Sequence, residues 1–251
     1  MTEPKLQKDI PSKIIEIIPQ THDTTVFRFS IPDNFEYYAG QFVMLRVDMK
    51  EENGFKIRDS KNPSQIRAFS IASSPTQKGY VETAIKAEEN GFVSVYMNKF
   101  SNKGDDVKIS GPYGKFYFKE GMGDEIVLLG AGSGITPLIG ILRYITAKNL
   151  PTKAMLVYSN KTPGDIVYAK ELKELAKHPN VKIVHTITRA KEEHQWEGET
   201  GRISEDLIKK NVPDITKPLY YICGSPEFSH EVESMIRKAG APAERVHTEK
   251  W

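Results

Sequence analysis

The sequence contains a single cysteine, Cys223, among its 251 residues. One thiol excludes a disulfide within the chain, and it also excludes an iron–sulfur cluster held by several of the chain's own thiolates. The histidines show no His-Glu-x-x-His spacing and no Cys-x-x-Cys pair accompanies them, and those patterns are typical of zinc sites. The sequence therefore predicts no metal centre.

Long apolar runs are also missing. No stretch approaches the roughly 20 apolar residues that a membrane-spanning helix needs, and residues 1–11 are charged and lack the apolar core of a secretory signal. The charges nearly balance, because 35 Lys and Arg stand against 33 Asp and Glu for a net charge of +2. We therefore expect no nucleic acid partner, no membrane insertion and a cytoplasmic location.

The first half of the chain has the pattern of short β-strands. Short β-rich runs are separated by polar loops, an arrangement typical of a small antiparallel barrel or sandwich. The composition, with 39% hydrophobic and 27% charged residues, is that of a soluble globular protein. We expect strands at 24–30, 41–47, 66–72, 80–86 and 106–109, with one helix at 93–100.

The pattern changes after residue 121. Apolar runs now alternate with helical segments, which predicts a parallel sheet with helices on both faces. Thr136, Thr162 and Ser225 each precede a proline and so predict helix starts, because the side chain can cap and proline suits the first helical position. We expect strands at 125–129, 154–158, 181–188 and 219–223, and helices from 137, near 166–177 and ending at Gly240.

A polar insertion at 48–65 is rich in Lys, Glu and Asn. The simplest interpretation is a solvated surface loop. The alternative is that its basic side chains help to dock an acidic partner. These side chains are Lys50, Lys56, Arg58 and Lys61.

Arg67-Ala68-Phe69-Ser70 combines three chemically different side chains in one short strand. Alternation places Arg67 and Phe69 on one face and Ser70 on the other face or at a local bend. Arginine can bind a phosphate through two hydrogen bonds, an aromatic ring can lie along a flat conjugated ring, and a hydroxyl can reach a ring nitrogen. Alone, the tetrapeptide is more typical of an ordinary edge strand.

Gly91-Phe92-Val93-Ser94 opens the expected helix of the first half. The free backbone N–H groups and the dipole of a helix start favour an anion. A glycine turn with a capping residue explains the same segment without any ligand.

Gly130-Ala131-Gly132-Ser133-Gly134 follows an apolar strand and precedes a helix, which is the context of a loop that binds dinucleotide phosphates. The loop lacks the third glycine of Gly-x-Gly-x-x-Gly, because Ile135 stands there, and it lacks the Lys-Ser/Thr of a P-loop. A purely structural turn is the alternative. The expected nucleotide contacts are Gly132, Ser133, Gly134 and Thr136.

Cys223-Gly224 ends an apolar strand, and ligands approach open parallel sheets at such strand ends. A solitary buried cysteine is more usually a small hydrophobic residue. No histidine or second cysteine stands close in a known thiol-enzyme motif, so we do not expect a nucleophile.

These motifs, in this order and with Glu249-Lys250-Trp251 at the end, resemble the ferredoxin-NADP reductase superfamily over nearly the whole chain. The resemblance implies an antiparallel Greek-key β-barrel that binds FAD, at residues 1–121. It also implies an α/β domain with a parallel sheet that binds NAD(P)H, at residues 122–251. In this superfamily a flavin takes hydride from a nicotinamide and passes electrons to a one-electron acceptor.

The resemblance also implies roles for the first-domain motifs. Arg67 binds flavin phosphate, Phe69 lies along the flavin where tyrosine is usual, and Ser70 hydrogen-bonds near its reactive nitrogen. The segment with Gly91, Val93 and Ser94 holds the pyrophosphate.

In the second domain the resemblance assigns Cys223 and Gly224 to the nicotinamide pocket. Glu249 lies near the hydride-transfer site, so that Ser70, Cys223 and Glu249 shape the reaction pocket. Trp251 replaces the usual terminal tyrosine and stacks on the flavin, where it would have to leave before nicotinamide can bind.

Two arginines, Arg189 and Arg202, match positions that bind the 2′-phosphate of NADPH in some relatives. No acidic residue obviously awaits a 2′-hydroxyl after Tyr158, so the sequence favours NADPH over NADH as the hydride donor. Two ordinary surface arginines are the alternative.

We therefore predict an FAD-dependent NAD(P)H oxidoreductase that delivers electrons to ferredoxin, an oxygenase component or another redox protein. Any iron–sulfur acceptor would belong to another chain, because this one has too few thiols. The alternatives are a free-flavin or quinone reductase, and a regulatory flavin-binding subunit without turnover.

Overall fold

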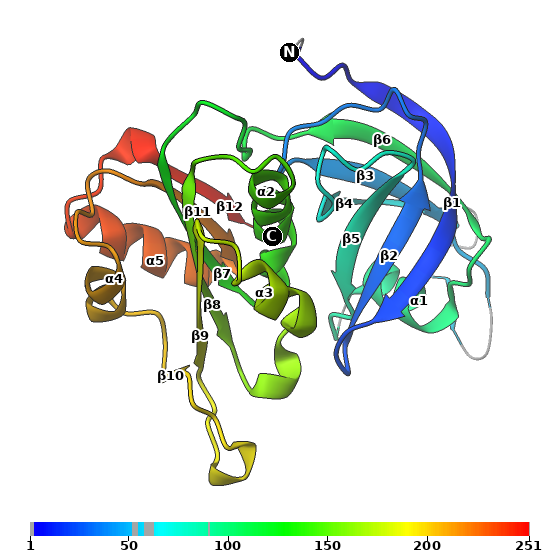
Figure 1. Ribbon diagram of the computed structural model, residues 1–251. Helices are drawn as coiled ribbons and strands as arrows, with labels where there is room; N and C mark the ends of the chain where they lie inside the picture. Colours follow the sequence, from blue (N-terminus) through cyan, green and yellow to red (C-terminus); the bar gives the residue numbers. More distant parts are fainter. Residues whose placement is uncertain (1–2, 52–54, 58–62, 90, 251) are drawn as a thin grey trace. The chain divides into compact units, whose positions relative to one another are not determined.

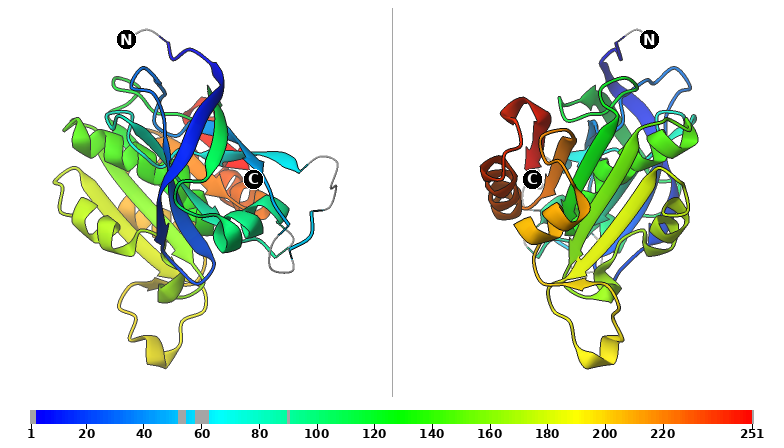
Figure 2. Two further views of the ribbon diagram at one scale, coloured as in Figure 1. Left: turned by 90° about the vertical axis from the view of Figure 1, so that its right-hand side faces the viewer. Right: turned by 60° about the vertical axis from the view of Figure 1, so that its left-hand side comes forward.

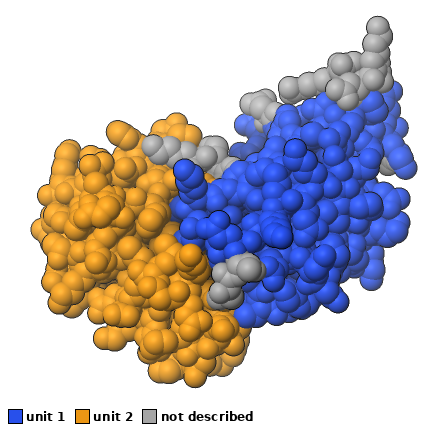
Figure 3. Space-filling model, turned by 90° about the horizontal axis from the view of Figure 1, so that it is seen from above, with its two compact units in different colours: residues 1–117 blue, residues 118–251 orange. Residues whose placement is uncertain are grey.

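The computed structural model describes residues 3–51, 55–57, 63–89 and 91–250. The chain divides into two compact units, Met1–Tyr117 and Phe118–Trp251, which Figure 3 shows in different colours. The division from the sequence pattern, after residue 121, lies a few residues further along the chain. Each unit has its own sheet.

The first unit is built on an antiparallel sheet of six strands in the order β4-β3-β6-β1-β2-β5. The sheet curls into a half-barrel, which confirms the predicted antiparallel barrel domain (Figure 1). The strands are β1 (Gln7–Pro19), β2 (Thr24–Ser30), β3 (Phe42–Asp48), β4 (Ser64–Ser70), β5 (Tyr80–Lys86) and β6 (Asp106–Tyr113), and helix α1 (Phe92–Phe100) follows β5.

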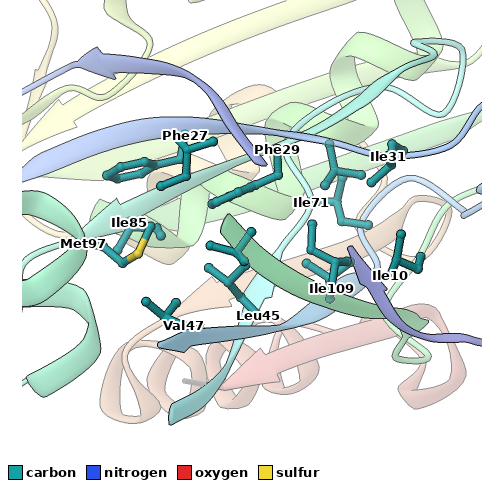
Figure 4. Close-up of a cluster of buried hydrophobic side chains, with 14 of the residues drawn as sticks. Ile10, Phe27, Phe29, Ile31, Leu45, Val47, Ile71, Ile85, Met97 and Ile109 are labelled. Atoms are coloured by element: carbon teal, nitrogen blue, oxygen red, sulfur yellow. The ribbon is translucent and has the colours of Figure 1, made fainter. Parts of the chain in front are cut away.

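The inner face of this sheet carries the hydrophobic core. Alternate residues of the strands point inward, so that Phe27 and Phe29 of β2 are fully buried and Leu45 of β3 packs in the same cluster (Figure 4). Met97 of α1 joins them from the helix. Burying one such side chain stabilises the fold by about 1.5–3 kcal/mol, which fixes the register of the strands that carry the first-unit motifs.

The second unit has a parallel sheet of six strands in the order β10-β9-β8-β7-β11-β12. Helices lie on both faces, as predicted: α2 and α3 on one side and α4 and α5 on the other (Figures 1 and 2). The strands are β7 (Glu125–Ala131), β8 (Lys153–Asn160), β9 (Val181–Ile187), β10 (Glu199–Thr200), β11 (Leu219–Gly224) and β12 (Val246–Lys250); the helices are α2 (Ile135–Ala147), α3 (Ala169–Leu175), α4 (Glu205–Asn211) and α5 (Pro226–Lys238).

The two faces of this sheet have different neighbours. Val127 of β7, Val157 of β8 and Ile222 of β11 pack in one cluster with residues of α4 and α5. Residues one position along each strand point the other way. Gly130 is an example, because a Cβ atom there would lie 2.8 Å from Leu138 of α2. Near the carboxyl edge, the side chains of β7, β8 and β11 therefore form one set that faces α4 and α5 and another set that faces α2.

Two of the three predicted helix starts need correction. Thr136 lies inside α2, and its hydroxyl donates 2.7 Å to the carbonyl of Ser133, because a 3₁₀ turn over Gly132–Gly134 leads directly into the helix. Thr162 precedes only a short 3₁₀ turn, and α3 begins later at Ala169. Ser225 caps α5 as predicted, because its hydroxyl oxygen accepts 3.2 Å from the N–H of Phe228.

No helix of the described residues is long and apolar enough to span a membrane.

Candidate functional site

Strand β4 displays the Arg-x-Phe-Ser motif at one edge of the first sheet. In its pairing with β3, Arg67 lies opposite Leu45, Phe69 opposite Val43, and Ser70 opposite Phe42. The side chains grade from exposed Arg67 through half-buried Phe69 to Ser70, which is only 5% exposed. The strand thus offers a cation in solvent, an aromatic surface and a buried hydroxyl within four consecutive residues.

The guanidinium of Arg67 donates one hydrogen bond of 2.7 Å to the carbonyl of Ile66. An arginine carries five N–H donors in a flat fork that matches a phosphate. The local bond holds the side chain close to the strand and leaves the fork suited to an anion.

The start of α1 is a compact turn. Ser94 donates 3.2 Å to the carbonyl of Gly91 and accepts 3.3 Å from the N–H of Glu88. A Cβ atom at position 91 would lie 2.3 Å from the Ser94 hydroxyl, so glycine is required for this contact. Val93 is buried in the core, so only its backbone can face a ligand.

In the second unit, the glycine-rich loop joins β7 to α2 and is held by two hydroxyl groups. Tyr158 of β8 donates 2.8 Å to the carbonyl of Gly132, and Thr136 donates to the carbonyl of Ser133. Gly132 has a φ of +53°, a conformation that favours glycine. The loop is therefore fixed by the protein itself, with the first N–H groups of a helical segment at its tip.

Gly134 brings this loop against the end of β11. A Cβ atom at position 134 would lie 2.1 Å from the carbonyl oxygen of Cys223 and 2.8 Å from the backbone nitrogen of Gly224. No side chain fits in that space. Two motifs that are far apart in the sequence, Gly132–Gly134 and Cys223-Gly224, therefore touch through their backbones.

The pairing of β11 with β12 adds Glu249 to the same edge. Cys223 lies opposite Glu249 in β12 and opposite Gly130 in β7. Ser229 of α5 lies 3.4 Å from the carbonyl oxygens of both Gly224 and Glu249, to which its hydroxyl donates. Cys223 is fully buried, so the thiol can shape the edge but cannot act as an exposed nucleophile.

His247 is a neighbour of this group that the sequence did not reveal. Its ring stacks on Tyr221 with the centroids 4.9 Å apart, and Tyr221 lies opposite it in β11. Burial lowers the pKa of His247 below its ordinary value of 6.5. The imidazole is therefore neutral at pH 7, two residues before Glu249 on the same face.

The two candidate 2′-phosphate arginines follow the neighbouring strands β9 and β10. Thr200, the last residue of β10, pairs with Ile187, the last residue of β9, and each arginine lies two residues beyond the end of its strand. Arg189 and Arg202 are both exposed. The guanidinium of Arg202, however, forms an ion pair with the carboxylate of Glu231 on α5, with an N–O distance of 2.9 Å.

Several predicted residues stand apart from these groups. Trp251, Arg58 and Lys61 lie outside the described residues, while Lys50 and Lys56 are exposed in the first unit. Ser70 belongs to the first unit, and Cys223 and Glu249 belong to the second.

Two family models match the chain, one for each unit. Residues 11–118 match the oxidoreductase FAD-binding domain, and residues 128–234 match the oxidoreductase NAD-binding domain. These matches assign FAD and a nicotinamide dinucleotide as the cofactors.

Curated relatives include a cytochrome reductase and an oxygenase component. NADH-cytochrome b5 reductase 2 of Candida glabrata is 31% identical over 95% of this chain and 78% of its own length. The reductase component of propane 2-monooxygenase of Rhodococcus jostii is 25% identical over 97% of this chain, which spans 64% of that protein.

Solved structures share the fold. The FAD/NAD-binding domain of nitric oxide dioxygenase from Vibrio cholerae matches with a TM-score of 0.83 at 20% identity, covering 98% of this chain and 99% of that one. A ferredoxin NADP+ reductase from Neisseria gonorrhoeae matches with a TM-score of 0.76 at 22% identity, covering 99% of both chains. Taken with the two domain models and the relative at 31% identity, this chain belongs to the ferredoxin-NADP reductase superfamily of flavoprotein oxidoreductases.

Proposed function

We propose that this FAD- and NAD-binding oxidoreductase accepts hydride from NADH and delivers electrons singly to a separate haem or oxygenase protein. The single observation that carries the proposal is the carboxyl edge of the second sheet, where the Gly132–Gly134 loop touches Cys223-Gly224 and Glu249 pairs beside them. Ligands of open parallel sheets bind at such an edge.

In the first unit, the residues of β4 suit FAD. Arg67 would hold a phosphate, Phe69 would lie along the ring system and Ser70 would donate to a ring nitrogen. The backbone around Gly91 and Ser94 would receive the second phosphate at the start of α1. When bound, FAD supplies the conversion between a two-electron hydride and single electrons.

In the second unit, the residues act by position. The buried Cys223 gives the nicotinamide a small apolar surface, while the main chain around Gly132 and Gly134 offers N–H groups to the dinucleotide phosphates. Glu249, held in β12, provides an acceptor beside that surface. Together they orient a nicotinamide ring and exclude water, and no proton has to leave a side chain in the hydride step.

NADH is the donor we propose, although the sequence alone favoured NADPH. The named cytochrome b5 reductases among the relatives use NADH. In addition, Arg202 already forms an exposed ion pair with Glu231, and this carboxylate competes with a 2′-phosphate for the guanidinium. Arg189 is the other candidate for that phosphate.

The electron acceptor we propose is a cytochrome b5-like haem protein or an oxygenase component. Relatives named for both kinds of partner match more than nine-tenths of this chain. A ferredoxin is the third candidate. The single cysteine means that these 251 residues hold no thiolate-bound iron–sulfur cluster of their own, so an iron–sulfur acceptor would lie outside them.

The first test is an anaerobic titration of the FAD-loaded protein with NADH and, separately, NADPH while the visible flavin band is followed. We expect NADH to bleach the band at lower concentration. Steady-state assays with cytochrome b5, ferredoxin, free FMN and a quinone then rank the acceptors. A protein that binds FAD but is bleached by neither nucleotide would contradict the reductase proposal and favour a regulatory subunit.

A further inference from the structure

Asn160, the last residue of β8, carries a buried amide that the fold does not use. The residue is 5% exposed, and neither its Oδ1 nor its Nδ2 atom has a hydrogen-bond partner within the described part of the chain. Native proteins pair most of their buried polar groups, because leaving one unpaired is costly. An amide with both ends unpaired therefore points to a ligand.

The position of Asn160 is the edge at which a nucleotide would bind. The residue before it, Ser159, pairs with Ala131, the last residue of β7 before the glycine-rich loop. Strand alternation puts the side chain of Asn160 on the same face as Tyr158, whose hydroxyl reaches Gly132 in that loop. The amide thus lies one step beyond Tyr158 toward the carboxyl edge.

The local structure does not explain the amide. The backbone carbonyl of Asn160 accepts 2.9 Å from the N–H of Thr188, a bond that any residue could make. The following turn satisfies itself, since the carboxylate of Asp165 accepts from both the N–H and the hydroxyl of Thr162. A side chain of similar size without polar atoms would serve the fold equally well.

The chemistry of the amide selects the kind of ligand group. Nδ2 donates and Oδ1 accepts, so the matching group must do both. A hydroxyl can do both, whereas a phosphate only accepts and would leave Oδ1 unpaired. The ribose units of a nicotinamide dinucleotide each carry two neighbouring hydroxyls.

We propose that Asn160 binds a ribose hydroxyl of the nicotinamide dinucleotide. The inference rests on the proposed binding of NADH in the second unit. If the hydroxyl is the 2′-OH of the adenosine ribose, the phosphate of NADPH replaces the hydrogen donor, and Asn160 discriminates against NADPH. If the hydroxyl belongs to the nicotinamide ribose, Asn160 instead positions the nicotinamide end of the dinucleotide, which carries the hydride.

The test is isothermal titration of the oxidised, FAD-loaded protein with NAD+ and with deoxy analogues that lack one hydroxyl on either ribose. The variants are Asn160→Leu and, as a matched control, Asn180→Leu. Asn180 lies just before the amino end of β9, at the opposite edge of the sheet, where its amide donates to Leu150. Thermal unfolding of each variant checks that it is folded.

We expect the wild type to lose about tenfold in affinity for one deoxy analogue, because that ligand leaves the buried amide unpaired. Asn160→Leu should bind NAD+ about tenfold more weakly and no longer distinguish that analogue, whereas Asn180→Leu should behave as the wild type. The analogue that loses affinity shows whether Asn160 binds the adenosine ribose or the nicotinamide ribose.

Three outcomes would overturn the inference. Asn160→Leu could bind NAD+ as tightly as the wild type, or it could bind more weakly yet keep the same deoxy penalty, which would show that the amide acts through the fold. Failure of the wild type to bind NAD+ would remove the nucleotide site itself. Oxidised flavin does not react with NAD+, so these affinities do not depend on turnover. If NADH still bleaches the flavin but Asn160→Leu loses as much affinity for the deoxy analogue as the wild type does, only this inference is refuted and the proposed function stands.

Discussion

Replacing Gly134 with alanine isolates the close backbone contact on which the nucleotide edge depends. The backbone of Gly134 has φ −62° and ψ −9°, a helical conformation that alanine adopts readily. Conformation alone would make Gly134→Ala stabilising by about 0.5–1 kcal/mol. The sign of the measured effect therefore reports on contact and not on backbone freedom.

The contact predicts the opposite sign. The added Cβ would lie 2.1 Å from the oxygen and 2.5 Å from the carbon of the Cys223 carbonyl. Both atoms belong to the backbone of an inner strand, so no flexible side chain can move aside. The loop must shift by more than 1 Å, because ordinary contact begins at 3.4 Å. Overpacking of this kind costs about 1–3 kcal/mol.

The functional cost should be larger than the cost in stability. A displacement of about 1 Å at a positioning loop can lower a rate by about 100-fold. We expect Gly134→Ala to bind FAD normally, because the flavin motifs lie in the other unit, and to show slow flavin reduction by NADH in anaerobic stopped-flow measurements. Urea unfolding measures the change in stability.

Gly132→Ala is the matched control in the same loop. Gly132 has φ +53°, and a Cβ atom there would meet nothing within 4 Å. The expected cost is about 1–2 kcal/mol from the left-handed backbone alone, without displacement against β11. A Gly134→Ala variant as stable as the wild type and as fast in flavin reduction would refute the close contact, and with it the proposed geometry of the edge.

Three further predictions follow from single side chains. Arg67→Ala should weaken FAD binding by roughly tenfold or more, because a charged hydrogen bond to phosphate is lost; flavin release on dilution measures this. Arg46→Ala on the adjacent strand is the control and should retain FAD. Equal retention by both variants would contradict the role of Arg67 in phosphate binding. Glu231→Gln should release Arg202 and raise kcat/KM for NADPH relative to NADH by about 2- to 5-fold, since an exposed pair contributes at most about 1 kcal/mol; an unchanged ratio would remove Arg202 from the site. Burial lowers the pKa of His247 below 6.5, so the folded state binds fewer protons than the unfolded state and stability should fall as the pH drops below 6.5. In His247→Phe the urea midpoint should therefore vary less between pH 7.5 and 5.5 than in the wild type. The same variation in both proteins would contradict the assignment.

Much of the fold could be predicted because it depends on local pattern. The run 24–30 is rich in β-branched and aromatic residues and forms β2 with those bounds, and the run 80–86 does the same as β5. Ser225 caps its helix because the cap and the following proline need only neighbouring residues. The glycine-rich loop was recognisable since strand, loop and helix are consecutive in the chain.

Elements that depend on tertiary contacts were not predictable in the same way. Strand β12, which holds Glu249, is formed by pairing with β11 and would otherwise be a short polar tail. Helix α4 has seven residues, too few for a clear amphipathic pattern, and it is held by packing of Leu207 and Ile208 in the core. Thr136 looked like a cap because the 3₁₀ turn before it has no sequence signal of its own.

The preference between NADH and NADPH is the property that the sequence motifs predict least well, because it depends on tertiary neighbours. Arg202 alone favours a 2′-phosphate, but in the folded protein its guanidinium forms an ion pair with Glu231 of α5, which lies 29 residues further along the chain. Asn160 alone looks like an ordinary polar residue after a strand, and its importance lies in the absence of partners for its amide once β8 and β9 have paired. The arginine is recognisable in the sequence but already has a partner in the fold, whereas the asparagine belongs to no recognisable motif and its amide has no partner in the described residues. The ion pair of Arg202 acts against NADPH, and Asn160 acts in the same direction if it binds the 2′-hydroxyl of the adenosine ribose. The nucleotide preference should therefore follow the tertiary neighbours of these residues and not the count of basic residues near the site.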